Sequence, residues 1–63
     1  MATLIHRGQE WQVKAGMTVR DAILKVGLNP EAVLAVRDGR LITEDNKIKD
    51  GDLIKLIAVV SGG

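Results

Sequence analysis

One amphipathic stretch, GMTVRDAILKVGLNP at residues 16–30, constrains the fold more than any other feature. Its apolar residues recur at the spacing i, i+3, i+4 and i+7, which places them on one face of an α-helix. These residues are Val19, Ala22, Ile23 and Val26. Thr18 stands where a helix N-cap belongs, and Gly27 stands where a C-terminal glycine cap belongs. We therefore predict one short helix with a single buried face.

Two short runs before this helix, Thr3–Arg7 and Glu10–Lys14, predict a β-hairpin. They flank a glycine-containing pair at positions 8 and 9, which we take as a two-residue loop. With that loop, Leu4 lies opposite Val13, and paired residues share one side of the sheet. The side chains expected to face the core are Leu4, Trp11 and Val13, with Ile5 and Gln12 on the other side.

Three further strands are predicted after the helix, at Ala32–Arg37, Arg40–Ile42 and Leu53–Val60. Asp-Gly pairs at 38–39 and 50–51 supply turns, because both residue types tolerate positive φ. The expected order is β-β-α-β-β-β, with the first and last strands adjacent and joined by a right-handed crossover. One helix covers one face of such a sheet, so we expect an α+β fold with the other face open.

The last strand is apolar on both faces. Ile54, Leu56, Ala58 and Val60 alternate with Leu53, Lys55, Ile57 and Val59, and Lys55 carries the one charge among these eight residues. A central strand is one explanation of this double-sided pattern. A docking patch is the other, since contiguous exposed apolar surface marks binding sites. For the second interpretation the patch consists of Ile5, Ile57 and Val59.

Composition excludes several classes of function. The chain has 63 residues, no cysteine and one histidine, so it forms one domain without a disulfide, a thiol nucleophile or a zinc site. The net charge of +1 with interspersed acids and bases argues against direct nucleic-acid binding. Neither a signal peptide nor an apolar run of ~20 residues is present, so we expect no membrane partner and a cytoplasmic location. No motif indicates catalytic residues, a metal or a bound cofactor.

Three short sequence segments are informative when they are considered together with the expected element order. They are LAVRDG at 34–39, IKDGD at 48–52 and VVSGG at 59–63. Together they resemble the ThiS/MoaD sulfur carriers, which are β-grasp relatives of ubiquitin, and the resemblance covers the whole chain. It implies a ubiquitin-like β-grasp domain at residues 1–60, with a mixed sheet of four to five strands and one helix on one face. It also implies a flexible Ser-Gly-Gly tail at residues 61–63.

The tail has a physical rationale as a carrier arm. Three extended residues reach ~10 Å, and glycine has no Cβ, so Gly62 and Gly63 suit a narrow channel in another protein. The reactive group delivered is the Gly63 carboxylate, which ATP activates as an acyl-adenylate before sulfur displaces AMP to give a thiocarboxylate. The chain itself is then a co-substrate and not an enzyme.

The resemblance implies several partners. They are a ubiquitin-activating-type adenylating enzyme that uses ATP, a sulfur donor such as a cysteine desulfurase or rhodanese, and an acceptor synthase or tRNA-thiolating enzyme. We expect the patch of Ile5, Ile57 and Val59 to dock on the adenylating enzyme. The acceptor pathway is tRNA thiolation, thiamin thiazole synthesis or molybdopterin synthesis, and the short segment TEDNK at 43–47 is more similar to the carriers of tRNA thiolation.

Two alternatives to a sulfur carrier remain open from the sequence. The chain is compatible with a ubiquitin-like modifier that is conjugated through Gly63 to target lysines. It is also compatible with an interaction domain whose terminus is inert.

Overall fold

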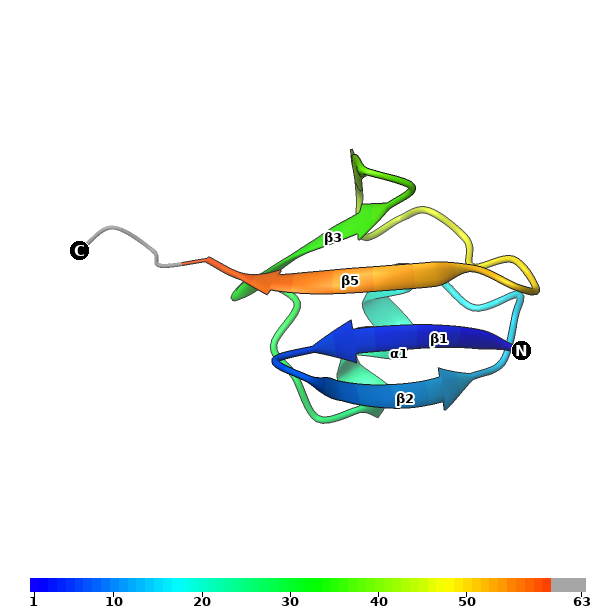
Figure 1. Cartoon of the computed structure of the whole chain (residues 1–63), viewed down its shortest axis with the longest axis horizontal. Helices are drawn as coiled ribbons and strands as arrows, with labels where there is room; N and C mark the ends of the chain where they lie inside the picture. Colours follow the sequence, from blue (N-terminus) through cyan, green and yellow to red (C-terminus); the bar gives the residue numbers. More distant parts are fainter. Residues whose placement is uncertain (60–63) are drawn as a thin grey trace.

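The first and last strands lie side by side at the centre of one mixed sheet (Figure 1). The structure is a computed structural model and describes residues 1–59. Its elements in chain order are β1 (Ala2–His6), β2 (Gln9–Val13), α1 (Val19–Lys25), β3 (Val33–Arg37), β4 (Arg40–Ile42) and β5 (Leu53–Ala58). The strand order in the sheet is β2-β1-β5-β3-β4, with β1 parallel to β5 and the other pairs antiparallel. The predicted α+β fold and element order are confirmed.

The β1–β2 hairpin differs from the prediction in its register. Leu4 pairs with Trp11 and not with Val13, because the loop consists of Arg7 and Gly8. Both loop residues have positive φ, 50° and 80°, as a type I′ turn requires. The shift moves every partner by two residues, and side chains alternate with a period of two, so the faces are unchanged. Leu4 and Val13 are buried and Trp11 is half-buried against the core, as expected.

Local hydrogen bonds fix both ends of α1 where the sequence predicts them. The Thr18 hydroxyl accepts from the N–H of Asp21 at 3.2 Å, as an N-cap residue does. At the other end, Gly27 has φ +85° and donates its N–H to the Leu24 carbonyl at 3.0 Å. The N–H of the following residue donates to the carbonyl of Ile23 at 3.0 Å. This pair of bonds is a Schellman motif, which ends a helix with a left-handed glycine.

The start of α1 is also bonded to a segment far along the chain. The N–H of Val19 donates to the Asn46 carbonyl at 2.9 Å, and the N–H of Arg20 donates to the Glu44 carbonyl at 3.0 Å. Ile48, in the same connection between β4 and β5, is buried. A helix of seven residues is too short to be stable alone, so these bonds and the core contacts hold it in place.

The core lies between α1 and the covered face of the sheet. Its buried apolar residues are Ala2, Leu4, Val13, Val19, Ala22, Ile23, Val33, Ala35, Ile48, Ile54 and Leu56. Three of the four residues in the predicted helix stripe belong to this set, and the fourth, Val26, is partly buried against it. The predicted helix face is therefore confirmed. No helix in residues 1–59 has the length and apolar character needed to cross a bilayer.

The helix offers a matched pair of substitutions that tests this core. Ile23 is buried and its neighbour Leu24 is 52% exposed. We expect Ile23→Ala to lower the free energy of unfolding by ~2–5 kcal/mol, because it removes buried methyl groups and leaves a cavity. Leu24→Ala is expected to cost well under ~1 kcal/mol. Urea denaturation followed by circular dichroism measures both, and similar losses would show that the buried face is wrongly assigned.

Candidate functional site

The predicted docking residues lie on the face of the sheet that α1 leaves uncovered, here called the open face. Ile5 on β1 is half-buried, and Ile57 on β5 is 52% exposed. Ile5 pairs in register with Lys55, two residues before Ile57, so the two isoleucines are diagonal neighbours on adjacent strands. Val59 is exposed just beyond the end of β5. The structure therefore brings Ile5 and Ile57 together and places Val59 two residues further along the chain.

The open face carries more aliphatic surface than the sequence alone indicates. Leu34 pairs with Ile57 across β3 and β5, and Leu41 pairs with Val36 across β4 and β3. Three of its leucines are largely exposed, Leu34 at 46%, Leu41 at 67% and Leu53 at 50%. We call the set Ile5, Leu34, Val36, Leu41, Leu53 and Ile57 the open-face patch. Its members come from four adjacent strands, and such a contiguous surface is typical of a docking site.

A signal for these extra residues was present in the sequence. The segment AVLAV at 32–36 is apolar at every position, as the last strand nearly is. A strand apolar on both faces, next to another of the same kind, predicts a shared apolar face away from the helix. Leu53 shares the open side of the last strand with Ile57 by alternation, although the predicted patch did not include it. Leu41 has no such local signal, because only the pairing of β4 with β3 places it on this face.

The predicted carrier terminus, Gly62 and Gly63, lies outside the described residues, as do the rest of the predicted tail and the domain boundary at residue 60. The path of the chain up to that point is defined. Because β5 is parallel to β1, it ends at the side of the sheet where the β1–β2 loop lies, on the left in Figure 1. The described part of the chain therefore ends at that edge, next to the open-face patch.

Hydrogen bonds hold β5 from both sides near its end. The Nδ1 atom of His6 lies 2.9 Å from the Leu56 carbonyl oxygen, one residue beyond the last β1–β5 pair. A carbonyl oxygen can only accept, so Nδ1 carries the hydrogen. On the other side, the N–H of Val59 donates to the Ala32 carbonyl at 2.8 Å. His6 is thus a strand-end residue with a structural role, and β5 is fixed up to Val59.

The start of β5 is fixed by an aspartate from the IKDGD segment. One carboxylate oxygen of Asp52, Oδ2, accepts from the Lys49 N–H at 2.8 Å and from Arg37 Nη1 at 3.0 Å. The Lys49 N–H, followed by the Arg37 guanidinium, holds the pKa of Asp52 below its ordinary value, against an opposing effect of burial. The backbone carbonyl of Asp52 also accepts from the N–H of Thr3 at 2.9 Å. Asp52 therefore ties β5 to both β1 and β3.

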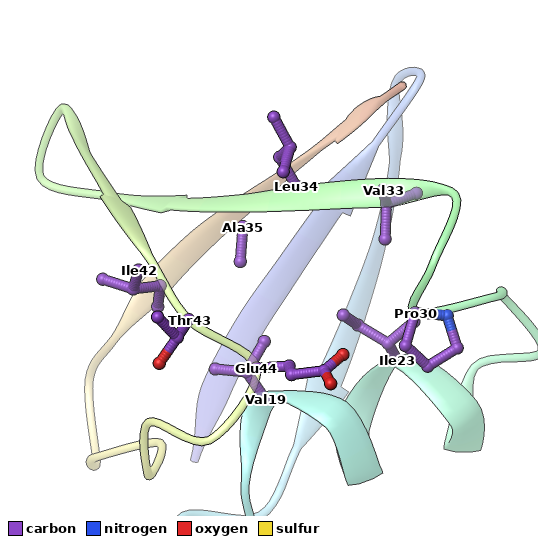
Figure 2. Close-up of a pocket in the computed structure, with 9 residues that line it drawn as sticks. All are labelled: Val19, Ile23, Pro30, Val33, Leu34, Ala35, Ile42, Thr43 and Glu44. Carbon is purple, nitrogen blue, oxygen red and sulfur yellow. The ribbon is translucent and has the colours of Figure 1, made fainter. Parts of the chain in front are cut away.

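A hollow of about 280 Å³ lies on the opposite side of the sheet, between α1, β3 and the end of β4 (Figure 2). Its lining is mainly aliphatic, and Leu34 in Figure 2 points away from Ala35, toward the open face. The acidic group at its rim, Glu44, is paired with Arg20 at 3.2 Å. The other polar side chain of the lining, Thr43, donates its hydroxyl to Asn46 Oδ1 at 2.9 Å. The hollow thus offers an apolar surface whose two polar side chains already have partners.

The Asp52 site generates a prediction about acid stability. A carboxylate whose pKa is lowered by folding stabilises the fold above its unfolded pKa, near the ordinary value of 3.8, and that contribution is lost as the pH falls through the folded pKa. We expect Asp52→Asn to lower the free energy of unfolding by about 1–2 kcal/mol at pH 7. The difference from wild type should shrink below about pH 3.8.

Urea titrations at pH 7, 5, 3 and 2 measure this difference. The control is Asp45→Asn, an exposed aspartate in the connection between β4 and β5, which should stay within ~0.5 kcal/mol of wild type at neutral pH. An Asp52→Asn difference that stays constant down to pH 2 would contradict the assigned role of the carboxylate.

Comparisons with known proteins agree on one family and one fold. The family model described as "ThiS family" matches residues 1–63. "Sulfur carrier protein TtuB" from Thermus thermophilus is 34% identical over 55 residues, which are 87% of this chain and 85% of that protein. Among solved structures, a ubiquitin-like protein from the hyperthermophilic archaeon Caldiarchaeum subterraneum superposes with a TM-score of 0.54 at 21% identity, covering 97% of each chain. This likeness shows that the sheet and helix form a ubiquitin-like β-grasp.

Proposed function

This chain belongs to the ThiS family. On that premise we propose that its function as a sulfur carrier depends on the carboxylate group of Gly63. The family match extends through residues 62–63, the terminal Gly-Gly pair, and this observation carries the proposal. The chain is acted on by other proteins and is not itself an enzyme.

The proposed reaction has three steps, all performed by other proteins. A ubiquitin-activating-type enzyme lets a Gly63 carboxylate oxygen attack the α-phosphorus of ATP, and pyrophosphate leaves. The terminal sulfur of a persulfide on a donor such as a cysteine desulfurase or rhodanese then attacks the acyl carbon and displaces AMP. A thiol of a partner protein finally reduces the resulting acyl disulfide, which releases the thiocarboxylate and leaves a disulfide between the two partner sulfurs. This chain supplies the substrate carboxylate and the docking surface, and the enzyme supplies the phosphate-binding and catalytic groups.

The geometry of β5 supports this division of roles. The same strand carries part of the open-face patch and leads directly to the terminus, and its hydrogen bonds fix it up to Val59. Four residues separate Val59 from the end of the chain, and four residues span at most ~14 Å when fully extended. A partner that docks on the patch would therefore find the carboxylate within ~14 Å of a fixed point.

Of the three acceptor pathways, we favour tRNA thiolation, because the short segment at residues 43–47 is more similar to the carriers of that pathway. The principal alternative is conjugation of Gly63 to target lysines. The intact mass of the protein isolated from its native cells separates these functions. A gain of 16 mass units (roughly the difference between sulfur and oxygen) supports a carrier, and a ladder of larger adducts supports a modifier.

The terminus itself is tested by three variants in an ATP–pyrophosphate exchange assay. Each ubiquitin-activating-type enzyme of the source genome is assayed with the wild-type chain. Deletion of Gly63 should abolish exchange, because the carboxylate then ends about 3.5 Å short. One residue added after Gly63 should also abolish it, because an amide replaces that carboxylate. Gly62→Phe keeps the carboxylate but is expected to block a narrow channel.

The unfolding free energy of the Gly63 deletion serves as its control and should match wild type. Normal exchange by the deletion would exclude both the carrier and the modifier functions, and would leave the interaction domain.

The docking role of the open face is tested by a pair of residues with equal exposure. Ile57 on the open face and Leu24 on the helix are each 52% exposed. We expect Ile57→Asp and Val59→Asp to raise the carrier concentration needed for half-maximal exchange by about tenfold or more, as for a charge placed in an apolar contact. Leu24→Asp should leave that concentration nearly unchanged. If Ile57→Asp and Leu24→Asp behave alike, the enzyme does not dock on this face.

A further inference from the structure

One lysine, Lys55, lies at the centre of the open-face patch. Lys55 pairs in register with Ile5 on β1 and with Val36 on β3. Leu53 and Ile57 precede and follow it at two-residue spacing on the same face of β5. The Lys55 side chain is exposed, and the four residues nearest to it on this face are all aliphatic.

Among the described residues, Lys55 has no charged partner within salt-bridge distance. The ion pairs formed among residues 1–59 involve the N-terminus, Arg20 and Arg37, and none includes Lys55. In the free protein, water solvates its ammonium group. A partner that covers the patch removes that water, and a buried ammonium without a counter-charge is strongly unfavourable.

A hollow of about 230 Å³ that Lys55 lines provides room for a side chain from a partner. It is lined by Val36, Asp38, Gly39, Leu53 and Lys55. Asp38 lies in the β3–β4 turn, at the margin of the patch, whereas Lys55 lies on a central strand. Charges at the rim of an interface remain hydrated, whereas charges at its centre lose their water. The ammonium of Lys55 is therefore the charge for which a partner must supply an opposite charge.

We propose that Lys55 selects the partner of this face: the adenylating enzyme presents an apolar surface with one aspartate or glutamate, which enters the hollow and pairs with the ammonium. This inference rests on the proposed function, because it takes the adenylating enzyme as the occupant. Two observations support that choice. The patch is continuous with the strand that leads to Gly63, and its aliphatic residues surround one cation, Lys55.

The test uses the enzyme that shows Gly63-dependent pyrophosphate exchange with the wild-type chain. Lys55→Glu reverses the charge, and Lys55→Met removes it while keeping an unbranched apolar stem. We expect the half-saturating carrier concentration to rise about 30-fold or more for Lys55→Glu and about 5-fold for Lys55→Met, with the maximal rate unchanged. Lys25→Glu and Lys25→Met, on the exposed side of α1, are the matched controls and should stay within about twofold.

A second set of variants, made in the enzyme, identifies the acidic group. Each aspartate or glutamate on the enzyme surface that binds the carrier is changed to lysine, and one such change should restore exchange with Lys55→Glu. Circular dichroism establishes that each carrier variant is folded. If Lys55→Glu does not fold, Lys55→Met decides the question.

Three results would overturn the inference. Wild-type half-saturation for both Lys55 variants would mean that the ammonium stays in water. Tighter binding of Lys55→Met would mean that the facing surface carries no acid. In both cases wild-type exchange still supports the proposed function. Absence of exchange by wild type with every enzyme assayed would overturn the proposed function and this inference together.

Discussion

The parallel pairing of β1 with β5 is the contact on which the rest of this structure depends. It joins the first strand to the last across the whole described chain, and it requires the crossover that carries α1 onto one face of the sheet. The Asp52 interactions fix one end of this pairing, and the bond from His6 to Leu56 extends it at the other. The same contact thus orders the core, leaves the open face uncovered and sets the edge at which the described chain ends.

Features encoded by local signals were predicted well from the sequence, and those decided by strand pairing were not. Thr18, Gly27 and the apolar stripe gave the helix and its two ends, because each acts through neighbours within one or two turns. The hairpin register was wrong by two residues, and the hydrophobic pattern cannot detect such an error, since it leaves every side chain on the same face. The register depends instead on Arg7 adopting positive φ, which its residue type does not favour.

The same distinction between local signals and strand pairing applies to the candidate site. The place of Ile57 on the open face was predicted because a strand apolar on both faces is visible in the sequence, and its docking role stays a prediction. The family resemblance, which the match to the ThiS model confirms, came from element order and the terminal glycines. Leu41 was missed, because its place on the open face follows from the pairing of β4 with β3, which no local pattern reveals. Leu53 was not included in the predicted patch, although its alternation with Ile57 had placed it on the same face. The assignments of Gly62 and Gly63 stay predictions, since the structure describes residues 1–59.

The main-chain hydrogen bonds between α1 and the β4–β5 connection affect which positions of such carriers can change in evolution. Glu44 and Asn46 accept the first helix N–H groups through their main-chain carbonyls, and a carbonyl of this kind is present whatever the side chain. The exposed side chains of Asp45 and Lys47 in this segment are therefore free to change while the same bonds persist. A lineage can thus acquire a new recognition surface at this end of the helix by point substitution, with its scaffold intact.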